Sequence, residues 1–286
     1  LRLGDLLHLD KPHIQSRLKT MLEYKNLELG GCYHQAPMSY PALLSWCEKK
    51  AEQFAPYITN TGNYITAALS NHQKVVLEAQ LGAMRDIDYG IFPYTSSSST
   101  ISAYGPIGAG IPGTLPDHIV GVLKAYSTCV GAGPFTAEKA MPEKWMESLR
   151  KSGGEYGAAT GRPRRVGPFD AVASAYGLKC QNADKIALTK LDVLSRMDEI
   201  PVITAYKLND ELITEFDPLD DLDSMTPVIQ TLPGWNTDIS KCRKYEELPE
   251  NARKYIETLE HLLNHEIQFI SVGAERNQYL TKGEWL

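Results

Sequence analysis

The segment KIALTKLDVLSRMDEIPVITAYKL (185–208) decides the fold class of this sequence. Its two apolar runs, 185–191 and 200–208, are short and rich in β-branched residues, which is typical of buried strands. A third such run at 267–272 follows a predicted helix whose apolar residues recur at helical spacing, namely Ala252, Tyr255, Ile256, Leu259, Leu262 and Leu263. Strands that alternate with helices predict an α/β fold with a largely parallel central sheet flanked by helices.

The N-terminal part of the chain predicts a different kind of structure. The first 70 residues are expected to be mainly helical, because apolar residues follow one face of a helix that starts near Pro41. The run 74–81 suits a buried strand, and 117–126 suits a helix capped by Asp117.

Three segments rich in glycine, serine and proline are predicted loops: 85–113, 130–135 and 153–167. A loop as long as 85–113 in a compact protein is usually either functional or disordered. No repeat or linker divides the chain convincingly. We therefore expect a single domain over 1–286, with a helical subregion over 1–72 and the sheet and substrate loops over 73–286.

The composition argues against several classes of protein. The chain has 29 Lys and Arg residues against 35 Asp and Glu, a formal charge of -6, whereas nucleic-acid readers and acidic-membrane binders are usually basic. No apolar run approaches the roughly 20 residues that cross a bilayer, and residues 1–11 do not resemble a secretory signal. The five cysteines are widely spaced without a C-x-x-C pair, which argues against a disulfide framework or a zinc site and favours a cytoplasmic location.

The segment GRPRR (161–165) concentrates three arginines in a loop that Pro163 stiffens and flanking glycines free. Guanidinium groups bind carboxylates and phosphates through paired hydrogen bonds, so this loop is a candidate clamp for an anionic substrate. The alternative is a solvated basic loop, which the composition alone favours slightly.

The segment LTKLDVL (188–194) places Lys190 and Asp192 at the end of a predicted strand. A carboxylate can accept hydrogen bonds from the ring N–H and the amino group of guanine, and the lysine stem can cover the ring face. Adenine presents the opposite pattern on that edge. The alternative is a charged pair that closes a strand.

Three weaker patterns are more easily explained without a ligand. GAGIPG (108–113) fits a dinucleotide fingerprint formally, but Pro112 sits where the helix would need a free N–H. His261 and His265 are spaced for one helix face, yet the H-E-x-x-H pattern of a zinc site is missing. The hydroxyl run 96–100 could bind phosphate, but such runs are often flexible loops.

In order, seven segments of this chain resemble the adenylosuccinate synthetase family. They are DIDYGIFPYTSSSST (86–100), KAYSTCVGAGPF (124–135), GAATGRPRR (157–165), LTKLDVL (188–194), TLPGW (231–235), YEELPENARKYI (245–256) and ISVGAER (270–276). The resemblance covers nearly the whole chain. It implies a P-loop-NTPase-like fold and a GTP-dependent ligase that joins IMP and L-aspartate, with Mg²⁺ as metal and a homodimer as assembly.

The resemblance also implies which residues contact each substrate. Those matching the IMP site are Gln80, Ser96, Val130, Thr160 and Arg162. Those matching the aspartate site are Ala158, Ala159, Thr160, Gly161, Arg162 and Arg164. Those matching the GTP site are Arg164, Lys190, Leu191, Asp192, Ser271, Val272 and Gly273.

Four positions depart from the family pattern and concern mainly the purine acceptor. The glutamine expected to face IMP is Gln80, one position before its usual slot, which Leu81 occupies. In addition, Cys129, Pro168 and Ser99 replace a usual Arg, Trp and Asn. The alternatives are therefore a relative that acts on another purine nucleotide, such as dGMP, or a catalytically dead remnant that binds nucleotide.

The family's phosphate loop, its catalytic acid and base and its metal ligand have no counterpart in this sequence. They are expected upstream of Leu1, so the sequence resembles the C-terminal two-thirds of such an enzyme, truncated at its N-terminus. On this hypothesis the polypeptide alone is inactive, and it exposes an unpaired sheet edge and an apolar face.

Overall fold

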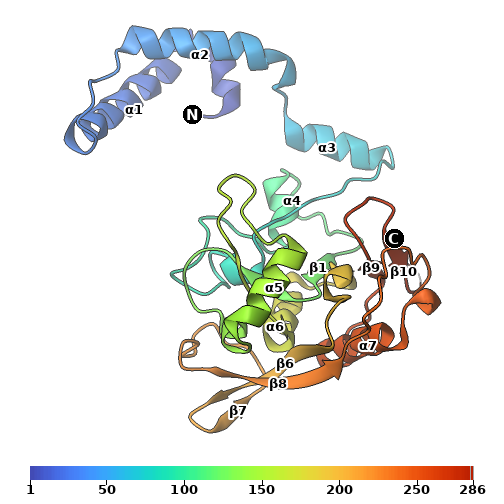
Figure 1. Cartoon of the computed structure of the whole chain (residues 1–286). Helices are drawn as coiled ribbons and strands as arrows, with labels where there is room; N and C mark the ends of the chain where they lie inside the picture. The colour runs from blue at the N-terminus through green and yellow to red at the C-terminus, as the bar shows by residue number, and fades with distance from the viewer. Residues whose placement is uncertain (284, 286) are drawn as a thin grey trace. The chain divides into compact units, whose positions relative to one another are not determined.

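The chain divides into two compact units in the computed structural model, which describes residues 1–283 and Trp285 (Figure 1). The first unit comprises Leu1–Val76 and Ala109–Ile111, and the second comprises Leu77–Gly108 and Pro112–Leu286. The expectation that they form parts of one domain stays a prediction. None of the described helices is long and apolar enough to span a membrane.

The first unit is helical, as the sequence predicts. Its elements are η1 (Leu3–His8), α1 (Pro12–Gly31), α2 (Tyr40–Phe54), η2 (Ala55–Tyr57) and α3 (Thr61–Ser70). At the start of α2 the Oγ of Ser39 accepts a hydrogen bond from the backbone N–H of Ala42 at 3.3 Å, which satisfies one free donor of the first turn. Ile14, Leu18 and Cys47 form a small buried cluster between α1 and α2.

The second unit is built around a four-stranded sheet in the order β1-β5-β9-β10. The strands are β1 (Val120–Lys124), β5 (Lys185–Thr189), β9 (Phe269–Ser271) and β10 (Tyr279–Thr281). β5 is parallel to both β1 and β9, and only β10 is antiparallel. The predicted strand over 185–191 and the predicted largely parallel sheet are therefore confirmed.

A second sheet surrounds β6 (Glu199–Leu208), which confirms the strand predicted over 200–208. It contains β4 (Phe169–Asp170), parallel to β6, and β7 (Glu211–Ile213) and β8 (Thr226–Pro233), both antiparallel to it. The ribbon of β2 (Ser127–Cys129) and β3 (Arg165–Gly167) is also antiparallel. The periodicity of the sequence did not reveal this antiparallel part.

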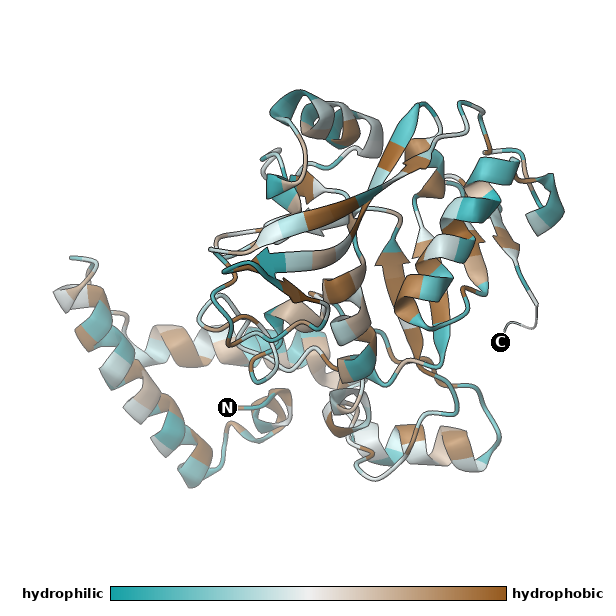
Figure 2. Cartoon of the chain, turned by 90° about the horizontal axis from the view of Figure 1, so that it is seen from below, coloured by the Kyte–Doolittle hydropathy of each residue, from teal (hydrophilic) through white to brown (hydrophobic). Residues whose placement is uncertain are grey.

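Helices cover the strands and complete the core. They are α4 (Tyr104–Gly108), α5 (Glu143–Gly153), α6 (Ala171–Gln181) and α7 (Glu250–Leu263), with the short turns η3 (Ala83–Arg85), η4 (Thr136–Lys139), η5 (Leu191–Leu194) and η6 (Tyr245–Glu247). Ile186 and Leu188 of β5, Ile270 of β9, and Tyr255 and Ile256 of α7 are all buried in the main core cluster. Figure 2 shows stretches of hydrophobic residues on the strands and on the helices, and both also carry hydrophilic residues.

Gly121, the second residue of β1, lets helix α6 approach the sheet closely. A Cβ on Gly121 would lie 2.5 Å from Cδ2 of Leu178 in α6, so the leucine side chain would have to move. Among the described strands, β1 pairs with β5 alone, and its Val122 is 68% exposed. This agrees with the expected unpaired sheet edge.

Two predicted elements are wrong. Residues 73–80 form no strand, and Val76 is 89% exposed, because no described strand offers this apolar run hydrogen-bond partners. Residues 120–124 form β1 instead of a helix. Parallel pairing with β5 provides hydrogen-bond partners for this backbone, and its valines suit a strand. The spacing of a few apolar residues could not distinguish such a short strand from a helix. The helix predicted from Ala252 to Leu263 is confirmed as α7.

We expect Gly234→Ala to destabilise the second unit severely. Gly234 follows β8, and a Cβ there would lie 1.7 Å from the carbonyl oxygen of Met197, while its own N–H donates to the carbonyl of Asp198 at 2.7 Å. The turn has no room to relax without losing that bond, so the free energy of unfolding should fall by about 3 kcal/mol or more in urea denaturation.

Gly177→Ala is the matched control. It lies inside α6, and its added Cβ would meet only the Cβ of Ala83 at 3.7 Å, an ordinary contact. The helix should gain about 0.5–1 kcal/mol, because alanine has the higher helix propensity. Equal urea midpoints for the two variants would contradict the packing described for Gly234.

Candidate functional site

The carboxyl ends of three parallel strands meet at one edge of the first sheet. Lys124 of β1 lies opposite Thr189 of β5, and Leu188 of β5 lies opposite Ile270 of β9. Lys190 and Ser271 therefore emerge side by side at the same edge as Lys124. In open α/β sheets ligands bind outside the carboxyl ends of the strands, so this edge is the candidate site.

The segment after β5 presents Lys190 and Asp192. Lys190 adopts a left-handed backbone conformation (φ 61°) that ends β5, and buried Leu191 then begins η5. Burial raises the pKa of Asp192 above its ordinary value. Within the described chain the carboxylate of Asp192 accepts no hydrogen bond from another side chain, so its oxygens can accept donors from a ligand.

The turn after β9 is closed by its own residues. The Oγ of Ser271 donates to the carbonyl of Gly273 at 3.0 Å, and the N–H of buried Val272 donates to the carbonyl of Gln278 at 2.9 Å. A Cβ on Gly273 would lie 2.3 Å from the side chain of Gln278, so only glycine fits this turn without displacing that side chain.

The loop that contains GRPRR (161–165), here called the arginine loop, forms a hairpin over residues 155–164. The N–H of Gly157 donates to the carbonyl of Arg162 at 2.8 Å, and the N–H of Arg164 donates to the carbonyl of Glu155 at 2.9 Å. The residues between them form the exposed tip of the hairpin: Ala158, Ala159, Thr160 and Gly161. The predicted loop is thus confirmed, although its stem is ordered by backbone pairing.

The three arginines of this loop lie in different environments. Arg165 binds both carboxylate oxygens of Glu138, with Nε to Oε2 at 2.7 Å, and also donates to the carbonyl of Gly133. Arg164 uses one Nη for Glu155, at 2.9 Å. The guanidinium of Arg162 is exposed and forms no hydrogen bond or ion pair with a described side chain. Arg162 and Arg164 therefore retain donors for a ligand, whereas Arg165 is engaged within the protein.

Sequence reasoning missed the residue that connects these segments, Glu155. Its side chain is fully buried, and Oε1 accepts hydrogen bonds from Tyr126 at 2.7 Å and from Lys124 and Lys190 at 3.0 Å each. Its Oε2 accepts from Arg164. Burial alone would raise the pKa of Glu155, but these hydrogen bonds outweigh it and hold the pKa at about 2. The only sequence signal was a lone acid inside a glycine-rich loop.

A second polar cluster orders the residues around Ser96. Asp86 is fully buried and accepts hydrogen bonds from the N–H of Thr100 at 2.6 Å and from the Oγ of Ser99 at 3.1 Å. Its pKa is lowered because backbone and side-chain donors outweigh the effect of burial. The loop 85–100 is therefore held in one conformation from inside.

Arg85 connects this loop with the segment after β2. Its carbonyl accepts the N–H of Ser96 at 2.8 Å, and its Nη2 donates to the carbonyl of Val130 at 2.9 Å and to the Sγ of Cys129 at 2.8 Å. The structure thus brings Ser96 and Val130 to one place. Gln80 lies in an exposed stretch without regular structure and forms no hydrogen bond with the described residues.

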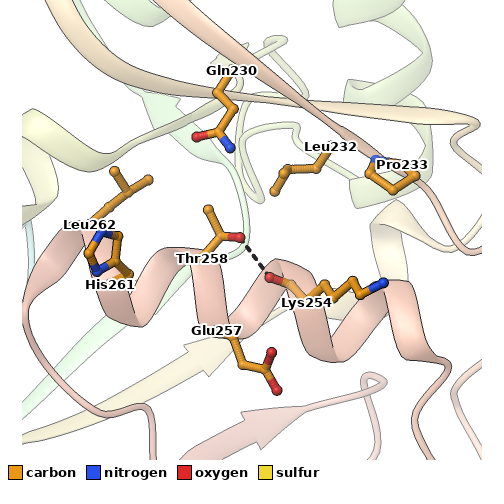
Figure 3. A pocket seen from close by; sticks show the side chains of 8 residues that line it. All are labelled: Gln230, Leu232, Pro233, Lys254, Glu257, Thr258, His261 and Leu262. Atoms are coloured by element: carbon orange, nitrogen blue, oxygen red, sulfur yellow. Dashed lines mark hydrogen bonds between the residues drawn. The ribbon is translucent and has the colours of Figure 1, made fainter.

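One cavity, of about 410 Å³, lies away from the sheet edge, between β8 and α7 (Figure 3). It is lined by Gln230, Leu232, Pro233, Lys254, Glu257, Thr258, His261 and Leu262, none of which belongs to the predicted substrate sites. His265 lies beyond the end of α7, so the two histidines do not share one helix. In the described part of the chain, no three His, Cys, Asp or Glu residues gather to hold a metal ion.

A parallel sheet with loops at its carboxyl edge places the second unit in the class of open α/β proteins, which bind their ligands at that edge. The profile of the adenylosuccinate synthetase family matches residues 1–280, and the chain belongs to this family. The adenylosuccinate synthetase of Carboxydothermus hydrogenoformans is 40% identical over 279 residues, which is 97% of this chain and 64% of that protein. That of Staphylococcus saprophyticus is 36% identical over 100% of this chain and 66% of that protein.

A solved structure agrees with the sequence comparison. The fully ligated adenylosuccinate synthetase from Plasmodium falciparum superposes with a TM-score of 0.88 at 32% identity, over 99% of this chain and 66% of that chain. This chain spans about two thirds of the length of the curated relatives that it matches. The resemblance inferred from the seven segments is confirmed.

We expect Arg165→Ala and Arg162→Ala to differ in stability. Removing Arg165 leaves half-buried Glu138 without its partner, so the free energy of unfolding should fall by about 1–3 kcal/mol. Arg162→Ala removes an exposed side chain, and the change should stay within about 0.5 kcal/mol. Urea denaturation measures both; a larger loss for Arg162→Ala would contradict the environments described.

We also expect Glu155 to contribute to acid stability. Because its folded pKa of about 2 lies below the value of about 4.3 in an unfolded chain, its contribution is fully present above about pH 4.3 and is lost as the pH falls through about 2. The difference corresponds to about 3 kcal/mol. In chemical denaturation across this pH range, the free energy of unfolding should depend less steeply on pH in Glu155→Gln than in the wild type. Superimposable curves of this free energy against pH would refute the lowered pKa assigned to Glu155.

Proposed function

We propose that this protein catalyses the GTP-dependent ligation of IMP and L-aspartate to adenylosuccinate, with release of GDP and phosphate. The observation that carries the proposal is the meeting of Lys190, Asp192 and Ser271 at one sheet edge, in a chain that belongs to the adenylosuccinate synthetase family. The arginine loop is joined to this edge through Glu155.

The guanine base is proposed to bind between the turns after β5 and β9. Asp192 would accept from the ring N–H and amino group of guanine, and the stem of Lys190 would cover the ring. Leu191, Ser271, Val272 and Gly273 would border the base. The proposal is supported by the half-buried, unengaged carboxylate of Asp192 and by the tight turn at Gly273.

L-aspartate is proposed to bind at the tip of the arginine hairpin. Arg162 and Arg164 would hold its two carboxylates through their free donors, with the backbone of 158–161 beside them. Arg164 would also reach the nucleotide. The proposal is supported by the contrast with Arg165, whose donors are already engaged.

IMP is proposed to bind across the loops that Arg85 connects. Ser96 would contact its phosphate and Val130 would border the ribose, with Thr160, Arg162 and Gln80 completing the site. In the reaction the purine 6-oxygen attacks the γ-phosphorus of GTP and GDP leaves; the aspartate amine then displaces phosphate from the purine carbon. Phosphorylation is needed because the carbonyl oxygen by itself is a poor leaving group.

Several parts of the proposal come from the family resemblance alone. These are the use of Mg²⁺ and a homodimeric assembly, whereas the proposed cytoplasmic location is also supported by the widely spaced cysteines. The described residues provide no metal-ligand cluster, so we assign none of them to Mg²⁺ and derive no step through it. We likewise assign the catalytic acid and base to none of the described residues.

A second candidate is the same reaction on another purine nucleotide, such as dGMP. It is favoured by the position of Gln80, which lies in an exposed stretch next to Leu81, whose φ of 75° is unusual for leucine. Comparing IMP with dGMP as acceptor in the full-length protein decides between the two.

The full-length protein should form adenylosuccinate from GTP, IMP, L-aspartate and Mg²⁺, detected by chromatography and mass spectrometry. In Asp192→Asn the amide replaces one acceptor by a donor, so kcat/KM for GTP should fall by about 10- to 100-fold and the preference over ATP should narrow. Asp117→Asn, an exposed carboxylate that precedes β1 at the opposite end of that strand from Lys124, serves as control and should leave kcat/KM for GTP and the preference over ATP unchanged. Absence of product with the wild-type protein would refute the proposed function.

A further inference from the structure

We propose that Glu155 is a positioning residue that fixes Lys190 and Arg164 in one geometry and so couples the nucleotide site to the amino-acid site. This inference rests on the proposed function, in which Lys190 contacts guanine and Arg164 contacts L-aspartate. Neither the sequence motifs nor the family comparison assigns Glu155 a role.

The first argument is the saturation of the Glu155 carboxylate. It accepts four hydrogen bonds, from Tyr126, Lys124 and Lys190 on Oε1 and from Arg164 on Oε2, and its side chain is fully buried. A buried carboxylate with four donors has one favourable arrangement, because any displacement leaves charge unpaired in a poorly solvated place. The partners are therefore fixed together.

The second argument is that Glu155 is itself held rigidly. Its N–H donates to the carbonyl of Arg150 at 2.9 Å, where Gly154 ends α5 in a left-handed conformation. Arg150 in turn donates from Nε to the carbonyl of Arg164 at 2.9 Å. The stem of the arginine hairpin is thereby attached to the C-terminal end of α5.

Lys190 is attached to the same helix end. Its Nζ donates to the carbonyl of Gly153 at 2.6 Å as well as to Glu155. A Cβ on Gly153 would lie 2.3 Å from the hydroxyl of Tyr126, so glycine is required for that hydroxyl to reach Glu155. The segment 153–155 thus contacts the guanine side and the aspartate side at once.

The third argument is electrostatic. Lys124, Lys190 and Arg164 converge on one point, and the nearest acid that pairs with all three is Glu155. Without it the three cations would repel one another and move apart, each toward solvent. A displacement of about 1 Å at a substrate-binding group can cost up to about 100-fold in rate.

The test is steady-state kinetics of Glu155→Gln in the full-length protein. We expect KM for GTP and KM for L-aspartate to rise together by about tenfold, and KM for IMP to change by less than about twofold. A purely structural role would lower the amount of active protein and its melting temperature without this split. Unchanged KM values for GTP and aspartate would overturn the inference.

Two further variants control for folding. Glu138→Gln breaks the neighbouring pair with Arg165 and should lower stability without raising either KM. Glu155→Gln combined with Lys124→Met removes one charge of each sign, so it should fold more readily than Glu155→Gln and still show the raised KM pair. Wild-type KM values in a folded double variant would overturn the inference even if Glu155→Gln does not fold.

A readout independent of activity separates this inference from the proposed function. In the ligand-free protein, acylation of Lys190 by an amine reagent, followed by mass spectrometry, should be several-fold faster in Glu155→Gln, with Lys254 as internal reference. If the wild type forms no adenylosuccinate, the proposed function fails while the labelling still tests the positioning. If the wild type is active and Lys190 is acylated at the same rate in the wild type and in Glu155→Gln, the inference about Glu155 fails while the proposed function stands.

Discussion

The parallel pairing of β5 with β1 and β9 is the constraint on which the rest of the second unit depends. Ile186 and Leu188 point into the core from β5, and both are fully buried. A slip of one residue would turn them toward the other face of the sheet, so their burial fixes the register. The register then determines which residues emerge at the carboxyl edge, and these are Lys124, Lys190 and Ser271.

Lys124 and Lys190 lie close together at one edge of the first sheet, so an opposite charge is needed beside them. Glu155 supplies it from a loop, and four donors offset the cost of burying its carboxylate. Those donors come from β1, from Tyr126 in the turn between β1 and β2, from the end of β5 and from the arginine hairpin. A single ionic cluster therefore joins elements that the hydrophobic core alone would not orient at this edge. Packing and charge therefore define the site together.

Much of the fold could be read from local pattern, and the failures have physical causes. The strand at 200–208 and the amphipathic helix α7 could be predicted because the apolar residues within each segment are the ones that become buried. In α7 these residues also recur at helical spacing. The run 74–81 carries strand-like residues, yet a strand exists only with a hydrogen-bonding neighbour, which no local pattern reveals. For β1 the pairing with β5 decided the structure where spacing had suggested a helix.

The site could be predicted only where a motif was contiguous. Lys190 and Asp192 lie in one segment and were proposed from their chemistry and from the family resemblance. Glu155 was missed because its partners Lys190, Lys124 and Tyr126 lie 35, 31 and 29 residues away in sequence. A residue whose role is to collect distant side chains leaves no signature at its own position, so it emerges only once the strands are placed.

The arginine loop shows why a count of charges could not identify the ligand-binding residues. Arg165 begins β3 and pairs across to Cys129, which places its side chain against Glu138 and over the ring of Phe135. Arg164, one residue nearer the tip, gives one donor to Glu155. Arg162 forms the last backbone pair of the stem with Gly157, and its side chain is exposed. Engagement with the protein thus decreases toward the tip, and the capacity to bind an anion increases in the same direction. The three arginines of GRPRR therefore differ in their capacity to bind a ligand, because they lie at different distances from the hairpin tip and have different partners within the protein.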